Sequence, residues 1–129
     1  MIRVYIDGSA RPNRGGIGIV IRGETYDYSI SEHIPEKVSN NEVEYKALNR
    51  ALRELMANKL TDGEIVIYSS SRMLVEQTSG ERDANQGKYY KDYLLAIKTI
   101  ENFSNLGFKR IPREMNSEAN RLASRAIGG

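Results

Sequence analysis

A chain of 129 residues with 40% hydrophobic residues is predicted to form one domain, residues 1–129. The absence of cysteine excludes disulfide scaffolds, thiolate zinc sites and cysteine nucleophiles, and it suits a reducing compartment. The net charge of +2 is too small to predict a nucleic-acid partner. No apolar run approaches the ~18 residues of a membrane span, and a strand that starts at residue 2 leaves no room for a signal peptide. We therefore expect a cytoplasmic monomer with no membrane and no obligate protein partner.

The first third of the chain predicts an antiparallel meander. Strands are expected over 2–7, 17–22 and 25–31, with a turn over 11–16 and Gly23 joining the last two strands. From residue 39 to about 58 the apolar period becomes helical. The stripe of this helix contains Leu48, Ala51, Leu52 and Leu55.

The rest of the chain alternates strands and helices. Residues 65–68 are nearly all apolar, which favours a strand that is buried on both faces and paired in parallel. Helices are expected over about 71–78 and 88–104, a last strand near 107–111, and a short helix over about 117–127. This order predicts an α/β domain on a mixed sheet.

Two carboxylates are candidates for chemistry. Asp7 ends the first strand before Gly8, where it offers an open oxygen ligand, although an Asp-Gly pair is also typical of a plain turn. Glu42 completes a capping box with Ser39, whereas Glu44 lies on the inward stripe of the helix. Because a buried unpaired carboxylate costs several kcal/mol, a metal or a hydrogen-bonded site is favoured over a simple salt bridge.

Other chemistries find no support in the sequence. The only histidine, His33, lies in a loop-like stretch unrelated to the serines, which argues against a serine triad. The glycines at 80 and 87 do not have the spacing of a phosphate-binding loop. Ser69, Ser70 and Ser71 follow the apolar strand at the sheet edge where catalytic groups collect, and three hydroxyls alone make a weak site there.

Four motifs in register resemble type 1 ribonuclease H. They read Y-I-D-G-S over 5–9, N-N-E-V-E over 40–44, Y-S-S-S over 68–71, and P-R-E-M-N-S-E-A-N-R-L-A over 112–123. The resemblance covers almost the whole chain. It implies a ribonuclease H-like fold, with three antiparallel strands and then two parallel ones in a mixed five-stranded sheet flanked by helices. It also implies endonucleolytic hydrolysis of the RNA strand of RNA/DNA hybrids with two divalent ions, Mg²⁺ or Mn²⁺.

The resemblance also assigns catalytic positions. The metal-ligand positions are Asp7, Glu44, Ser70 and Asn120, and Arg113 lies near the scissile phosphate. Ser70 and Asn120 stand where the family carries aspartate. An asparagine keeps a carbonyl oxygen that hard cations accept, whereas serine offers only a neutral hydroxyl. We therefore expect catalysis to be impaired or silenced by Ser70, and the alternative is a non-catalytic module that binds RNA/DNA hybrids.

Substrate contacts follow from the same resemblance. Asn40 and Asn41, with backbone near the first strand and its turn, correspond to contacts with the RNA strand, although both residues also suit the start of a capped helix. Lys37 and Ser39 correspond to a pocket for a DNA phosphate. The substrate-binding residues expected in full are Gly8, Ser9, Gly16, Lys37, Ser39, Asn40, Asn41 and Ser71.

Overall fold

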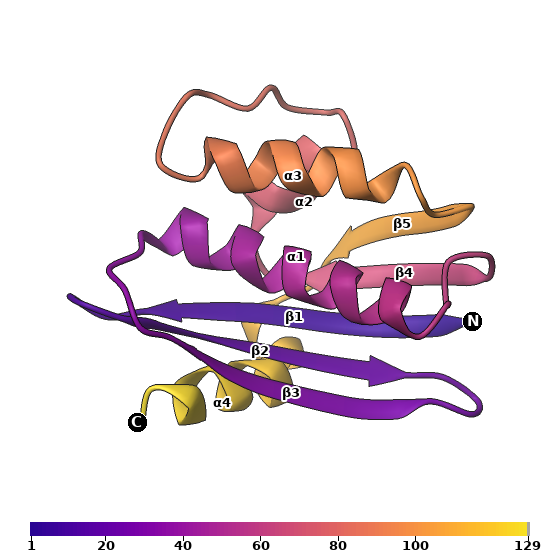
Figure 1. The fold of residues 1–129 in the computed structure, drawn as a ribbon, viewed down its shortest axis with the longest axis horizontal. Coiled ribbons are helices and arrows are strands. Elements are labelled where there is room, and N and C mark those ends of the chain that lie inside the picture. Colours follow the sequence, from indigo (N-terminus) through magenta and orange to yellow (C-terminus); the bar gives the residue numbers. More distant parts are fainter. Residues whose placement is uncertain (129) are drawn as a thin grey trace.

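A five-stranded mixed sheet organises the molecule in the computed structural model, which describes residues 1–128 (Figure 1). Its strand order is β3-β2-β1-β4-β5. The strands are β1 (Ile2–Ala10), β2 (Gly15–Arg22), β3 (Asp27–Ile34), β4 (Glu64–Ser69) and β5 (Asn105–Arg110). β1, β2 and β3 pair antiparallel, and β4 is parallel to both β1 and β5. The predicted sheet, with three antiparallel strands followed by two parallel ones, is confirmed.

The helices follow the predicted order with shifted ends. They are α1 (Asn40–Ala57), α2 (Arg72–Thr78), α3 (Tyr90–Ile100) and α4 (Ser117–Ala126), with a short 3₁₀ helix, η1 (Arg113–Asn116), before α4. β3 begins at Asp27 rather than near 25, because residues 23–26 form the turn, in which the Gly23 N–H donates to the Tyr26 carbonyl. Within residues 1–128, every helix is too short or too polar to cross a bilayer.

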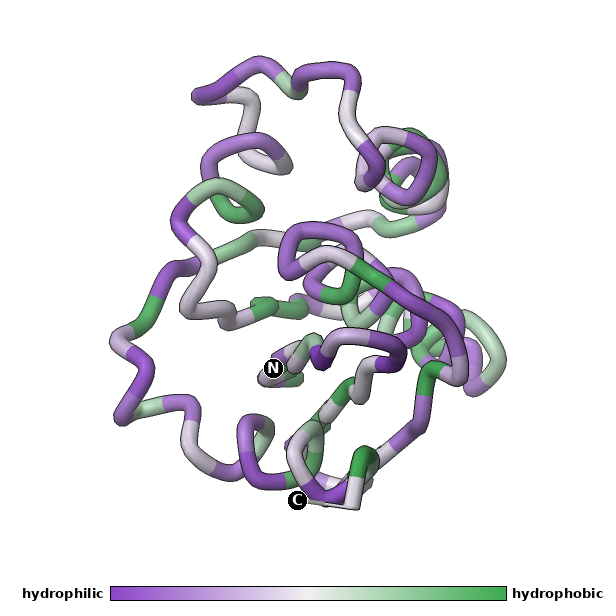
Figure 2. The backbone as a smooth tube through the Cα atoms, turned by 90° about the vertical axis from the view of Figure 1, so that its left-hand side faces the viewer, coloured by the Kyte–Doolittle hydropathy of each residue, from purple (hydrophilic) through white to green (hydrophobic). Residues whose placement is uncertain are grey.

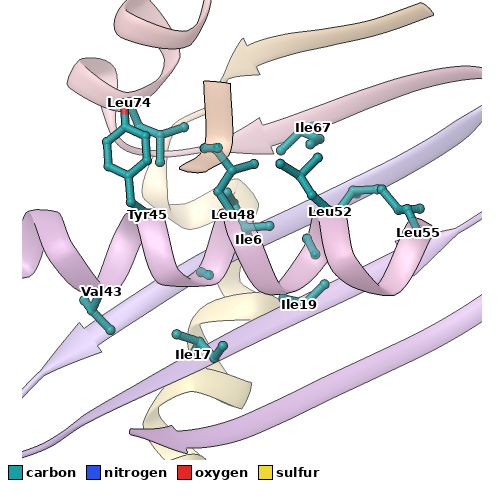
Figure 3. Packing of buried hydrophobic residues seen from close by; sticks show 14 of the residues in the cluster. Ile6, Ile17, Ile19, Val43, Tyr45, Leu48, Leu52, Leu55, Ile67 and Leu74 are labelled. Atoms are coloured by element: carbon teal, nitrogen blue, oxygen red, sulfur yellow. The ribbon is translucent and has the colours of Figure 1, made fainter. Parts of the chain in front are cut away.

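The core lies between the sheet and α1. Leu48, Leu52 and Leu55 of α1 are fully buried, as predicted, and they pack over the sheet (Figure 3). Figure 2 views the molecule from the end at which β1 reaches Ala10, with hydrophobic segments along the strands and many hydrophilic ones in the outer loops.

The prediction that the strand over 65–68 is buried on both faces is wrong. In β4 only alternate residues are buried, Ile65 and Ile67 among them, while Val66 and Tyr68 remain half-exposed on the opposite face. The helix on that opposite face, α4, packs against β1, β2 and β3 instead. Tyr68 is covered partly by the ring of Tyr5, with ring centroids 4.9 Å apart.

Glycines let two helices approach β1 and β2 closely from opposite faces. A Cβ atom on Gly8 would lie 2.8 Å from the Val43 backbone of α1. A Cβ atom on Gly18 would lie 2.0 Å from the Ala119 carbonyl oxygen of α4, and one on Gly16 would lie 2.3 Å from the Ala123 carbonyl oxygen. All three distances are below van der Waals contact, so only glycine allows these approaches.

Candidate active site

A polar pocket of about 430 Å³ lies at the carboxyl ends of β1 and β4, where ligands collect in open α/β sheets. Its lining residues are Asp7, Gly8, Ser9, Ala10, Arg11, Asn40, Asn41, Glu44, Ser70, Ser71, Arg113 and Asn120. The strand register explains why two of them meet. Tyr5 pairs with Tyr68, so Asp7 and Ser70 each lie two residues beyond the last registered pair, and both line this pocket.

Asp7 is held from the α4 side. Its side chain is almost fully buried, and Asn120 Nδ2 of α4 donates a hydrogen bond of 2.8 Å to its Oδ2. An asparagine that meets a carboxylate must present its N–H group, because a carboxylate only accepts hydrogen bonds. Asn120 therefore acts toward Asp7 as a hydrogen-bond donor in this structure.

Glu44 is held from the α1 side. Its Oε1 accepts a hydrogen bond of 2.9 Å from the Gly8 N–H, which follows Asp7 in β1. Burial, then the negative charge of Asp7, raises the pKa of Glu44 to about 8, although the Gly8 N–H and the positive charge of Arg113 oppose this shift. The carboxyl group is therefore mostly protonated at neutral pH in the protein alone, and its contact with β1 matches the hydrogen-bonded site predicted for it.

The shift at Glu44 predicts a pH-dependent stability. Since the folded pKa of about 8 exceeds the ordinary 4.5, Glu44 stabilises the fold fully below pH 4.5, and this contribution is lost as the pH rises through about 8. In EDTA, Glu44→Gln is expected to be close to the parent protein in stability at about pH 5 and to exceed it by about 4 kcal/mol at about pH 9. Urea unfolding of both proteins at the two pH values measures this. The same difference at both values, or an equal gain in the exposed-site control Glu101→Gln, would contradict it.

Two of the three serines have structural roles. Ser69 is buried, and its Oγ accepts the Ser71 N–H at 3.0 Å. Ser71 caps α2, with its Oγ accepting the Leu74 N–H at 3.1 Å. Ser70 lies between them and lines the pocket. Ser70, which the resemblance assigns to a carboxylate position, is thus the one serine of the three whose side chain has no capping or turn hydrogen bond among the described residues.

The start of α1 supplies the asparagines. Ser39 caps the helix, and the predicted capping box with Glu42 is confirmed by reciprocal hydrogen bonds of 3.1 and 2.9 Å. Asn40 and Asn41 are exposed and line the pocket. Ser39 and the exposed Lys37 lie outside the lining, as does Gly16, which is buried against α4. Their expected contacts with substrate stay predictions.

Comparison with known proteins places the chain in a family. A family model described as reverse transcriptase-like matches residues 5–126. The chain belongs to this family. Its structure superposes on LC11-RNase H1, solved in complex with an RNA/DNA hybrid, with a TM-score of 0.89 and 35% identity over 99% of this chain and 97% of that one. RNase H1 from the halophilic archaeon Halobacterium salinarum NRC-1 gives a TM-score of 0.88 and 25% identity, covering 98% of this chain and 97% of that one. The putative hydrolase EbsB of Enterococcus faecalis is 30% identical over 98% of this chain and 94% of its own length.

The reverse transcriptase-like domain thus has the predicted ribonuclease H-like fold. The sequence interpretation missed two pocket residues, Ala10 and Arg11. The reason is that β1 was expected to end at residue 7, whereas it continues to Ala10 by pairing with Gly15. The glycines that pair with this end of β1, Gly15, Gly16 and Gly18, were the sequence signal for a longer hairpin. Arg11 Nη1 then donates to Ser9 Oγ at 3.1 Å, which places a cation at the pocket rim.

Only two acidic residues, Asp7 and Glu44, line the pocket of this reverse transcriptase-like domain. Throughout residues 1–128, no three Asp, Glu, His or Cys side chains gather in an arrangement that could hold a metal ion. The site combines two carboxyl groups with three amides, three hydroxyls and two guanidinium groups.

Proposed function

We propose that this chain is a ribonuclease H-type nuclease, that it binds RNA/DNA hybrids at the Asp7–Glu44 pocket, and that Ser70 impairs its hydrolysis of the RNA strand. One observation carries the proposal: side chains distant in the sequence, from β1, α1, α4 and the end of β4, converge on one polar pocket. The similarity to ribonucleases H1 over almost the whole chain supports the reaction class.

The residues present do not fit the pair of divalent ions that the family resemblance implies. Asp7 and Glu44 carry at most two negative charges against the four positive charges of two such ions. Asn120 carries a neutral amide and adds no negative charge. Ser70 adds only a neutral hydroxyl, so the donor set lacks the charge that would hold both ions. This deficit is the physical basis for impaired catalysis.

Substrate binding uses groups that remain in place. Asn40 and Asn41 are exposed at the start of α1 and carry amide donors and acceptors that can read a 2′-hydroxyl across a shallow minor groove. Arg113 is exposed at the pocket rim, where its guanidinium can pair with a phosphate of the cleaved strand. Binding therefore does not require the missing carboxylate.

Binding without divalent ions tests this half of the proposal. We expect the chain to prefer an RNA/DNA hybrid over duplex DNA, and we expect the double variant Asn40→Ala/Asn41→Ala to lose most of that preference. Fluorescence anisotropy in a salt titration with hybrid, duplex DNA and duplex RNA measures both. The matched control is Asn102→Ala/Asn105→Ala, which removes two exposed asparagines outside the pocket lining. An unchanged preference in the Asn40/Asn41 variant would show that these contacts are wrongly assigned.

A second candidate function is a non-catalytic module that binds RNA/DNA hybrids. The hydrogen bond from Asn120 to Asp7 favours it, since this contact satisfies one oxygen of Asp7 without a cation. The two functions differ in one outcome. A nuclease gains activity when the charge at position 70 is restored, whereas a site that has been rebuilt for binding does not.

The proposal also predicts that Asn120 is tolerated in catalysis. In a Ser70→Asp background, Asn120→Asp is expected to change the cleavage rate by less than ~10-fold, or about 1.4 kcal/mol in barrier, because rotation of the amide offers a carbonyl oxygen in place of the carboxylate. Single-turnover cleavage of a labelled hybrid by both proteins gives the ratio. Activity that emerges only after Asn120→Asp would contradict the prediction and make position 120 a second cause of the deficit.

A further inference from the structure

Asn116 is a buried polar side chain at the junction of η1 and α4, and neither the resemblance nor the proposed function assigns it a role. It is 2% exposed. Its Nδ2 donates a hydrogen bond of 2.8 Å to the carbonyl oxygen of Ile6. Its Oδ1 is buried and has no hydrogen-bond partner among the described residues.

The contact joins the two elements that build the Asp7–Asn120 pair. Ile6 immediately precedes Asp7 in β1, and Asn116 lies about one helical turn before Asn120, at the junction of η1 and α4. Two adjacent residues of β1 are therefore held by side chains one turn apart: Asn116 on Ile6, and Asn120 on Asp7, each at 2.8 Å.

The contact also lies where the pairing of β1 with β4 ends. The parallel register between β1 and β4 ends at Tyr5 and Tyr68. Ile6 is the first residue of β1 beyond it, and its carbonyl is bonded by a side chain that is distant in the sequence. Asn116 thus continues the support of β1 up to the pocket.

Stability alone does not account for an asparagine at this position. A buried acceptor without a partner costs about 1–3 kcal/mol. Asn116 occupies the N-cap position of α4, yet its side chain makes no capping hydrogen bond. The one favourable polar contact of the side chain is the one to β1, next to the site.

We propose that Asn116 is a positioning residue: by bonding the Ile6 carbonyl, it fixes the start of α4 against β1 so that the Asn120 amide meets Asp7. The geometric part of this inference does not depend on activity. Its consequence for catalysis rests on the proposed function.

The geometric part is tested by NMR on the full chain. Asn116→Asp is nearly isosteric but removes the donor, and Asn116→Ala is the second variant in case a buried charge prevents folding. We expect the side-chain amide protons of Asn120, identified by their loss in Asn120→Asp, to exchange with solvent at least ~10-fold faster in either Asn116 variant. The control Asn102→Asp removes an exposed side-chain donor to a backbone carbonyl just after α3 and should leave that exchange unchanged. Unchanged exchange in a folded Asn116 variant would overturn the inference.

The catalytic part is tested in the Ser70→Asp background with a double-mutant cycle. Asn116→Ala is expected to lower kcat about 10-fold with little change in KM when Asn120 is present, and by less than ~2-fold when Asn120→Ala is also present. A purely structural role would lower the rate equally in both backgrounds and would overturn the assignment. If Ser70→Asp itself shows no cleavage, the proposed function fails, while the NMR result still decides the role of Asn116.

Discussion

Replacing Ser70 with aspartate is expected to raise the rate of hybrid cleavage by at least ~100-fold, the effect typical of one well-placed electrostatic stabiliser. Ser70 directly follows the end of β4 and lines the same pocket as Asp7, Glu44 and Asn120. A carboxylate there adds a third carboxyl group, with a hard oxygen ligand for Mg²⁺ or Mn²⁺. Since no cap or turn depends on Ser70, the change should leave the fold intact.

Initial rates of the parent chain and Ser70→Asp, at the same Mg²⁺ or Mn²⁺ concentration, measure the gain. Ser29→Asp is the control for added charge, because Ser29 is exposed on β3, away from the pocket. Equal rates for the parent chain and Ser70→Asp would contradict the prediction. An equal gain in Ser29→Asp would show that charge in general, and not its place, is responsible.

The second large effect is expected from Gly18→Ala, which should destabilise the fold by about 3 kcal/mol. The new methyl group would lie 2.0 Å from the Ala119 carbonyl oxygen and 2.7 Å from the Ala123 backbone nitrogen. Both atoms belong to the backbone of α4, so the helix itself has to move. Because Asn120 is part of α4, this movement should also lengthen its contact with Asp7.

Chemical denaturation tests this prediction: Gly18→Ala should unfold at a lower denaturant concentration than the parent protein, with an unchanged dependence of the unfolding free energy on denaturant. Gly107→Ala is the matched control: Gly107 also lies in a strand, and a Cβ there would have no neighbour within 4 Å. Its stability should equal or slightly exceed that of the parent, because alanine loses less chain entropy than glycine on folding. Equal stability of Gly18→Ala and Gly107→Ala would contradict the claim that position 18 must be glycine because α4 lies so close to β2.

Local patterns in the sequence predicted the elements and the helical part of the site. The apolar period of α1 located Leu48 and Leu55 in the core, and the S-x-x-E spacing located the capping box at Ser39. Glu44 was found because a carboxylate on an inward helical stripe needs a partner, which the Gly8 N–H supplies. These signals are local, so a single sequence carries them.

Most of the features that the sequence did not reveal depend on contacts between segments that are distant in the sequence. β1 extends beyond residue 7 because it pairs with β2, and one face of β4 stays half-exposed because α4 packs against β1, β2 and β3. The hydrogen bonds from Asn116 to Ile6 and from Asn120 to Asp7 join the first strand to the last helix, across more than a hundred residues of sequence. No periodic pattern encodes such contacts.

One cleavage experiment tests the central claim most directly. A hybrid whose RNA and DNA strands carry different fluorophores is incubated with Ser70→Asp and with Ser70→Asp/Glu44→Gln, and both strands are resolved on a denaturing gel. We expect Ser70→Asp to cut the RNA strand alone and Glu44→Gln to abolish the cut, because both carboxyl groups belong to the pocket. Cleavage of the DNA strand, cleavage that survives Glu44→Gln, or no cleavage of either strand would contradict a ribonuclease H site at the carboxyl ends of β1 and β4.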